Sequence, residues 1–411
     1  MSQAQRHQVI RGRIDWHLLM PAVILAALGV VMVASSSIAV AQAKMGDPAY
    51  YLTRHVIYLV LGMAAAAVAL RIEMLRLEQV GRLWLLLAFI ALLLVFMPGL
   101  GHTVNGATRW INLGVIRFQA VEAVKLLMIL YLAGYLVRQG HTVQMTLTGV
   151  LKPILAVGGM VGLLLLQPDF GSAVLLVAIA VGMIWLAGAR IGNLGLLAMA
   201  GLPLLIWAAM FESYRMKRVF SFLRPWETPF SDGFQLTQSL IAVGRGEWFG
   251  VGLGASVQKL FYLPEAHTDF IVAVLAEELG LIGLLLTLAL FVWLTGRAFL
   301  VGFRCMQMGQ RFAGYCVFGI ALWLSVQALI SIGVNMGMLP TKGLTLPLIS
   351  SGGSSLIMTC LAIGLLLRCS AELDRAERQG LAAADESAAD ELQDSPAGPE
   401  QPLPPGNWVP A

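Results

Sequence analysis

Residues 270–296 read FIVAVLAEELGLIGLLLTLALFVWLTG, and this stretch decides the fold class. It is almost wholly apolar, and roughly 20 apolar residues are enough for a helix to cross a lipid bilayer. Comparable apolar stretches occur at about 16–40, 52–70, 83–97, 119–137, 153–169, 170–187, 194–211, 313–337 and 349–369. The sequence therefore predicts an all-α, polytopic integral membrane protein with about ten transmembrane helices.

The composition agrees with this fold class. Of the 411 residues, 58% are hydrophobic and only 12% are charged, whereas about a quarter of the residues of a soluble domain are charged. There is no room for a separate soluble catalytic domain. We expect a cytoplasmic N-terminal segment at 1–15, a membrane domain at 16–370 with a long external loop at about 212–267, and a disordered, acidic cytoplasmic tail at 371–411.

The distribution of lysine and arginine predicts the orientation. The short loops on the side of the N-terminus hold fifteen of these residues, and the short loops on the other side hold five. Cytoplasmic loops carry the excess of positive charge. Both termini are therefore expected in the cytoplasm, and the loop at 212–267 outside, since long loops translocate largely regardless of their charge.

Charge and cysteine usage exclude some classes of function. The net charge of +4 hides an acidic tail, because nine acids and two arginines lie from Glu372 onward. The remaining basic excess suits anionic lipid or substrate head groups. The basic residues are scattered over many short loops, so nucleic-acid binding is not expected. The four cysteines have no CxxC spacing and the acids are dispersed, so no protein-bound metal site is expected either.

Charged residues at membrane depth are costly, which makes them candidates for function. Glu122 and Lys125 are three residues apart in QAVEAVK, so they share one helical face. They either form a neutralising ion pair or line a polar cavity where one of them meets a head group. Asp169, in QPDFG, lies at a helix break, where an aspartate most often caps the next helix.

The loops predicted to lie outside hold further candidates. Arg109 either anchors its loop at the interface or grips a phosphate group, which guanidinium groups do bidentately. In the long loop, apolar residues recur at helical spacing from Phe234 to Val243, which predicts a short interfacial helix. The glycine-rich stretch at 244–254 lacks the GxGxxG spacing of a nucleotide-binding loop and is more suited to close backbone packing.

The segment YLPEAHTDF at 262–270 places Asp269 where a polar stretch enters an apolar one. The helical positions of Glu277 and Glu278 are about 80° and 180° from that of Asp269, so these carboxylates do not form an acid–base pair with it. Asp269 is then either a helix cap or a functional carboxylate. In MLPTKGLTLPLISSGGSS at 338–355, prolines and glycines forbid a regular helix across most of the segment, and such backbone at membrane depth is tolerated only where it is buried in protein or lines a cavity. Lys342 and the serine hydroxyls would face that cavity.

Together these motifs resemble the SEDS family of bacterial envelope proteins, and the cell-division branch more than the elongation branch. The resemblance covers about residues 14–370 and rests on NGATRWINLG, QPDFG, FQLTQSLIAVGRG, GVGLGASVQKLFYLPEAHTDF and GMLPTKGLTLPLISSGGSS. It departs from the family pattern at Ala120 and Val121, where Pro and Ser are usual, and at Ser351, where Tyr is usual.

The resemblance implies a membrane glycosyltransferase at the division septum, in the bacterial cytoplasmic (inner) membrane. It would polymerise lipid II, the undecaprenyl-pyrophosphate-linked disaccharide pentapeptide, into glycan strands. Its expected partners are a class B penicillin-binding protein, the septal transpeptidase, and other divisome proteins. No cofactor is certain, although a divalent cation (Mg²⁺ or Mn²⁺) can accompany a pyrophosphate.

The resemblance also implies residue roles. Asp269 is expected to be the general base of an inverting displacement. The residues expected to bind substrate are Arg109, Glu122, Lys125, Arg218, Lys259, His267, Lys342 and Ser354. Two other functions fit the membrane architecture: a lipid II flippase, and a scaffold that recruits a transpeptidase without chemistry of its own.

Overall fold

The computed structural model describes residues 12–104, 107–112, 114, 117–211, 213–231 and 233–393, and these are mostly helical. The long helices are α1 (Trp16–Met45), α2 (Tyr50–Ala69), α5 (Ala120–Met145), α6 (Leu147–Leu166), α8 (Ile191–Phe211), α11 (Ile271–Gln307), α12 (Arg311–Asn335) and α13 (Gly353–Gln393). The shorter elements are α3 (Met74–Val80), α4 (Leu83–Leu94), α7 (Phe170–Leu186), α9 (Ser213–Leu223), η2 (Pro225–Glu227), α10 (Phe234–Gly246), β1 (Gly101–Val104), β2 (Ala107–Asn112) and β3 (Arg117–Gln119).

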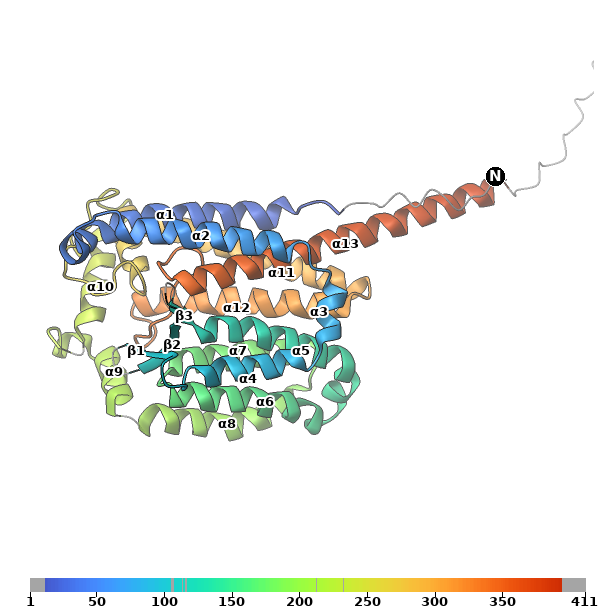
Figure 1. Cartoon of the computed structure of the whole chain (residues 1–411), viewed down its shortest axis with the longest axis horizontal. Helices are drawn as coiled ribbons and strands as arrows, with labels where there is room; N and C mark the ends of the chain where they lie inside the picture. Colours follow the sequence, from blue (N-terminus) through green and yellow to red (C-terminus); the bar gives the residue numbers. More distant parts are fainter. Residues whose placement is uncertain are drawn as a thin grey trace, which may run out of the picture.

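The fold class predicted from the sequence is confirmed, and every predicted apolar stretch falls on a helix. Within the described residues, seven helices are long and apolar enough to cross a membrane. An eighth span is formed if α3 and α4, which meet at a bend of 71°, cross together. The apolar helix α7, with 17 residues, falls just short of this length. The roughly parallel helices form one bundle (Figure 1).

The sequence did not predict the small antiparallel sheet β1-β2-β3 that lies between α4 and α5. Strands of three to six residues give too short a periodic signal to be recognised in the sequence. In the sheet, Trp110 pairs with Gln119, and Ile111 pairs with Phe118. Figure 1 shows the sheet at the same end of the bundle as α9 and α10.

The sequence predicts disorder from residue 371 onward, whereas in the structure α13 continues to Gln393. This part of the chain is rich in Ala, Glu, Leu and Arg, which favour helix. Two ion pairs at i, i+4 spacing, Arg368 with Glu372 and Asp374 with Arg378, support the extension. Residues 394–411 and most of the predicted N-terminal segment, 1–11, lie outside the described residues.

Small residues let the helices approach closely. A Cβ atom added to Gly62 of α2 would lie 2.9 Å from the sulfur of Cys360 in α13, and one added to Gly364 of α13 would lie 2.6 Å from the carbonyl oxygen of Ala66. Van der Waals contact of this kind replaces the hydrophobic effect as the force that joins helices inside a membrane. Of the seven candidate spans, α5, α12 and α13 are the most enclosed, whereas few residues of α2 are buried.

The helix α11 is broken near its start, and the glycine-rich loop that follows α10 packs into the break. Gly280 has φ 68° and ψ −168°, which only glycine adopts readily. The amides of Val251 and Gly252 donate to the carbonyls of Glu277 and Glu278, at 2.9 and 3.1 Å. The amide of Leu281 in turn donates to the carbonyl of Glu247 at 2.9 Å. The loop thus takes up backbone groups that the break would leave without partners.

This break gives a test of the architecture. A Cβ atom at Gly280 would lie 2.4 Å from the amide nitrogen of Gly250, so Gly280→Ala adds a steric clash to a strained backbone. We expect the substitution to lower the free energy of unfolding by about 3 kcal/mol or more. Thermal unfolding of the purified protein in detergent measures this. The matched control is Gly296→Ala in the same helix, where nothing lies within 4 Å of an added Cβ, and equal stability losses for the two variants would contradict the assignment.

Candidate active site

Two buried carboxylates attach the glycine-rich loop to α11. The Glu277 side chain accepts hydrogen bonds from the hydroxyl of Ser256 and from the amides of Val257 and Gln258. The Glu278 side chain pairs with Lys259 at 2.7 Å and accepts from the hydroxyl of Ser35. Both glutamates are at most 1% exposed. We refer to the contacts of Glu277 and Glu278 with Ser256, Lys259 and Ser35 as the glutamate clamp.

The sequence analysis excluded these glutamates as partners of Asp269 but missed the clamp. The available signal was the cost of two adjacent charges in an apolar helix, since such charges need partners. The sequence around Glu277 and Glu278 does not indicate which distant serine and lysine would be these partners.

Asp269 lies just before α11, at the end of the loop that the clamp holds. The cap interpretation of Asp269 is wrong, because the N-cap of α11 is Phe270 and the Asp269 side chain accepts no hydrogen bond from the first turn of this helix. Instead the side-chain amide of Asn335 donates to the backbone carbonyl of Asp269 at 3.0 Å and its oxygen accepts from the amide of Ala273 at 3.1 Å. Among the described residues, the Asp269 carboxylate has no ion-pair or hydrogen-bond partner. It is held in place through its backbone while its oxygens stay available.

The segment PTKG packs directly against this carboxylate. A Cβ atom at Gly343 would lie 2.8 Å from Oδ2 of Asp269, so any larger residue at this position would displace the carboxylate. The guanidinium of Arg218, in α9, donates to the carbonyl of Thr341 at 2.9 Å. The ammonium of Lys342 lies 4.2 Å from the centre of the Phe170 ring, at the start of α7. Of the predicted residues, Lys342 therefore lies on the segment that borders Asp269, and Arg218 contacts this segment from α9.

Arg109 reaches the same region from the sheet. Its Nε atom donates to the carbonyl of Gln167 at 3.3 Å, and its Nη2 atom donates to the carbonyl of Pro168. These carbonyls belong to the QPDFG corner that leads into α7. Asp169 in this corner caps α7, because its side chain accepts from the amide and the hydroxyl of Ser172. The cap interpretation is confirmed for Asp169.

The pKa of Asp269 reports how these charges act together. Burial raises the pKa of this carboxyl to about 7, and the negative charges of Glu265 and Asp169 add to the increase. The positive charges of Arg218 and Arg109 act in the opposite direction. Asp269 is thus a carboxyl group that exchanges its proton near neutral pH, beside two guanidinium groups. This is what a general base at physiological pH requires.

His267 and Ser354 hold the segments that surround the site. The His267 ring lies 4.5 Å from the Tyr51 ring, and its backbone carbonyl accepts from the amide of Ser351 at 2.9 Å. Burial lowers the pKa of His267, which favours the neutral imidazole. The hydroxyl of Ser354, at the start of α13, accepts from the amide of Gln119 at 3.3 Å. A direct contact of either residue with substrate stays a prediction.

Glu122 and Lys125 form the ion pair that the sequence suggested, with 2.8 Å between the charged atoms. The pair is buried, with the Lys125 side chain 1% exposed. Lys125 also donates to Gln327 at 2.9 Å and lies 4.7 Å from the centre of the Trp323 ring. The amide of Gln327 donates to the carbonyl of Thr345 at 2.8 Å, so the network supports the segment that follows Gly343. Its role in substrate binding stays a prediction.

Lys259 belongs to the glutamate clamp rather than to the group of cations near Asp269. The Lys259 and Glu278 side chains are 9% and 0% exposed. Lys259→Met would leave a buried carboxylate without its counter-ion, so we expect the free energy of unfolding to fall by about 3 kcal/mol. Thermal unfolding in detergent measures the change. As a control, Arg224→Met removes an exposed ion pair with Glu227 and is expected to cost no more than about 0.5 kcal/mol. A Lys259→Met protein as stable as the parent would contradict the clamp.

The described residues contain no group of three or more His, Cys, Asp or Glu side chains that could hold a metal ion. What they do contain is a carboxylate that titrates near neutral pH, two arginines and a lysine, gathered at one end of a helical bundle. The fold and the site together define a multi-pass membrane protein with a carboxyl group and several cationic side chains at one end of its bundle.

The family is shown by comparison with known sequences. Residues 15–375 match the FTSW_RODA_SPOVE family, described as cell cycle proteins, and the chain belongs to this family. It is 56% identical over 376 residues to a protein of Xanthomonas oryzae pv. oryzae, covering 92% of this chain and 76% of that protein. It is 50% identical to a protein of Coxiella burnetii, covering 90% and 100%. Both relatives are named probable peptidoglycan glycosyltransferase FtsW. The resemblance drawn from the motifs is confirmed.

Solved structures agree with this family. A chain of a peptidoglycan synthase complex, described as coordinating polymerization and crosslinking, matches with a TM-score of 0.69 and 30% identity over 87% of this chain and 97% of that chain. The rod shape determining protein RodA of Thermus thermophilus matches with a TM-score of 0.62 and 27% identity over 87% of this chain and 96% of that chain.

Proposed function

We propose that this protein is a peptidoglycan glycosyltransferase that polymerises lipid II into glycan strands, with Asp269 as the general base. The names of the relatives support the activity. The observation that carries the role of Asp269 is its carboxylate, which caps no helix, has no partner among the described residues and has a pKa of about 7. A structural aspartate would be expected to show at least one of the contacts that Asp169 makes.

The chemistry needs one base. The 4-hydroxyl of the acceptor sugar attacks the anomeric carbon of the lipid-linked donor, and the bond from that carbon to the pyrophosphate oxygen breaks. The Asp269 carboxylate takes the hydroxyl proton as the new C–O bond forms, and the lipid pyrophosphate leaves with the bonding electron pair. A single inverting displacement requires no covalent carboxylate intermediate. General-base catalysis of this kind contributes about 10² to 10⁴ in rate.

The leaving pyrophosphate needs positive charge. Arg109, Arg218 and Lys342 come from three separate segments, and each contacts the QPDFG corner or the segment at 341–343. Fixed cations placed where charge develops stabilise the transition state more than mobile water does. A divalent cation, Mg²⁺ or Mn²⁺, would enter with the pyrophosphate rather than on a protein cluster. Five further residues would support substrate binding indirectly, because they hold the segments around the site: Glu122, Lys125, Lys259, His267 and Ser354.

We further propose that the protein acts in the bacterial cytoplasmic (inner) membrane at the division septum, with both termini in the cytoplasm. The excess of Lys and Arg on one side supports the orientation. The similarity to a chain of a peptidoglycan synthase complex supports a crosslinking partner, which would be a class B penicillin-binding protein with other divisome proteins.

The first test is the removal of the base. Asp269→Asn keeps the size of the side chain but cannot accept the proton, so we expect polymerisation of labelled lipid II by the purified protein with its transpeptidase partner to fall at least about 100-fold. Thermal unfolding and binding of lipid II should stay close to those of the parent. Glu265→Gln, an exposed carboxylate four residues earlier, is the matched control and should retain most of the activity.

A folded Asp269→Asn protein that binds lipid II and still polymerises it near the parent rate would refute the base assignment. Transport of lipid II across vesicle membranes without formation of polymer, by the parent protein, would instead indicate a flippase. A scaffold would be indicated if substitutions of Asp269 had no effect on function, while substitutions on the surface of the spans abolished recruitment of the partner.

The second test is pH dependence. The carboxylate form of Asp269 is the active one, so kcat/KM should be constant above about pH 7 and should fall with decreasing pH below it, as the carboxylate takes up a proton. The negative charge of Glu265 raises the pKa of Asp269. Glu265→Gln should therefore move this decline to lower pH, and Arg218→Gln should move it to higher pH. A decline that neither substitution moves would belong to another group.

A further inference from the structure

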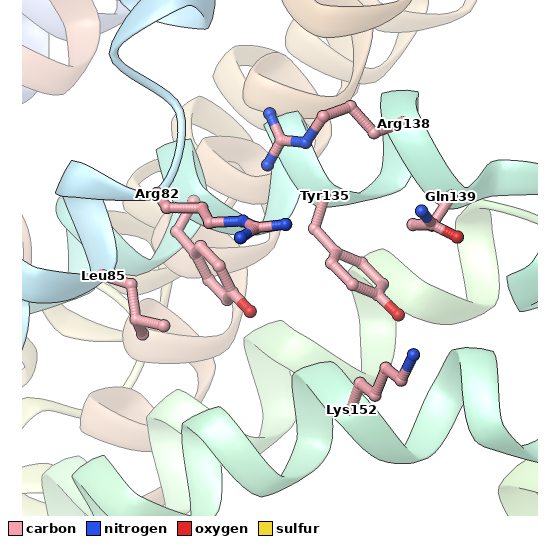
Figure 2. Close-up of a pocket in the computed structure, with 7 residues that line it drawn as sticks. Arg82, Leu85, Tyr135, Arg138, Gln139 and Lys152 are labelled. Carbon is pink, nitrogen blue, oxygen red and sulfur yellow. The ribbon is translucent and has the colours of Figure 1, made fainter.

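A basic pocket of about 280 Å³ lies between α4, α5 and α6, outside the proposed active site. Its lining residues are Arg82, Leu85, Tyr131, Tyr135, Arg138, Gln139 and Lys152. Figure 2 shows the guanidinium ends of Arg82 and Arg138 on one side of the Tyr135 ring and the charged end of Lys152 on the other, near the Tyr135 hydroxyl. Three cations from three helices thus face one pocket, and no carboxylate lines it.

The local structure positions Arg138 and the Tyr135 ring of this pocket without neutralising its cations. The Arg138 side chain packs against two glycines. A Cβ atom added to Gly134 would lie 3.1 Å from Nη1 of Arg138, and one added to Gly81 would lie 3.7 Å from the same atom. Tyr135 donates its hydroxyl to the carbonyl of Gly149 at 2.8 Å, which fixes the ring between α5 and α6. Within the part of the chain that the structure describes, none of the three cations forms an ion pair. Like charges that share a pocket repel one another, so an anion bound there would relieve the repulsion.

The pocket lies at the opposite end of the bundle from Asp269. Lys152 is near the start of α6, whereas Arg109 contacts Gln167 just after its end. Fifteen residues of α-helix separate these positions, which is about 22 Å along the axis. The proposed active site and this pocket are therefore distinct, and the cations of the pocket do not contact the group that reacts at Asp269.

We infer that this pocket binds the phosphate head group of an anionic membrane phospholipid, in the leaflet opposite the one that faces Asp269. Basic pockets between membrane helices on the cytoplasmic side are suited to anionic head groups. Two guanidiniums supply bidentate donors for phosphate oxygens, and the lysine adds a point charge. The volume is several times the roughly 30 Å³ that one water molecule occupies, so the pocket can admit a phosphodiester with part of its glycerol.

The surface next to the pocket favours a lipid over a soluble anion. Leu86 follows Arg82 by about one helical turn in α4, and Leu155 follows Lys152 by about one turn in α6. These leucines are 54% and 64% exposed. A ligand whose phosphate lies among the cations would place its acyl chains on this apolar surface, which a free phosphate ion would leave uncovered.

Lipid binding can be measured directly on the full-length protein. The purified protein is titrated with phosphatidylglycerol, and separately with phosphatidylcholine, and the bound lipid is counted by native mass spectrometry. We expect one site that prefers phosphatidylglycerol and that weakens about five-fold for each charge removed in Arg82→Gln, Arg138→Gln and Lys152→Gln. Lys152→Arg keeps the charge and should retain the affinity.

Arg304→Gln is the matched control, because Arg304 is an exposed cation at the end of α11 and lies outside the pocket. It should bind phosphatidylglycerol like the parent. Thermal unfolding of each single variant identifies any that do not fold, and the remaining variants still decide the question.

Three results would overturn the inference: unchanged binding in all folded pocket variants, an equal loss in Arg304→Gln, or equal affinity for both lipids. Competition by millimolar inorganic phosphate as strong as that by phosphatidylglycerol would assign the pocket to a soluble anion instead. Polymerisation of lipid II in detergent without phosphatidylglycerol should be the same in parent and pocket variants, so failure here leaves the proposed function unaffected.

Discussion

The break in α11 at Gly280 is the feature on which the proposed active site depends. An unbroken helix would use its own amides to bond the carbonyls of Glu277 and Glu278, and the loop at 247–259 would have no place to attach. Because the helix opens, the backbone of the loop enters the gap and the glutamate clamp fastens it. The chain then runs from the clamp to Asp269 within about ten residues. The position of the carboxylate is thus determined by a defect in a helix more than 30 residues long.

The same arrangement explains why the carboxyl group of Asp269 titrates near neutral pH. Burial against Gly343 and the start of α11 removes water from the carboxylate, which raises its pKa. The positive charges of Arg109 and Arg218 stabilise the ionised form and limit this increase. If the guanidiniums paired directly with it, its pKa would lie low and its oxygens would be occupied. Their bonds to the carbonyls of Thr341, Gln167 and Pro168 hold them beside the site instead. The balance between desolvation and nearby charge suits a base that must be ionised yet reactive.

Two groups of basic residues lie at the two ends of the bundle and differ in what they can do. The cations near Asp269 accompany a carboxylate, so a ligand there meets both a proton acceptor and positive charge. The pocket between α4, α5 and α6 has cations and tyrosine but no acid, so it can hold an anion without chemistry.

The sequence by itself determined the membrane fold and the apolar helical segments, and it indicated Asp269 as a candidate, because apolar length and motif identity are local properties. Periodicity also located α10, and the QPDFG break located the Asp169 cap. Only the tertiary structure decided that Asp269 caps nothing, that Lys259 belongs to Glu278 and that Lys125 is enclosed by Trp323 and Gln327. It also revealed the small sheet and the pocket of Arg82, Arg138 and Lys152. The physical reason is that the partner of a charge is chosen by which distant segments pack together, and no local pattern records that choice.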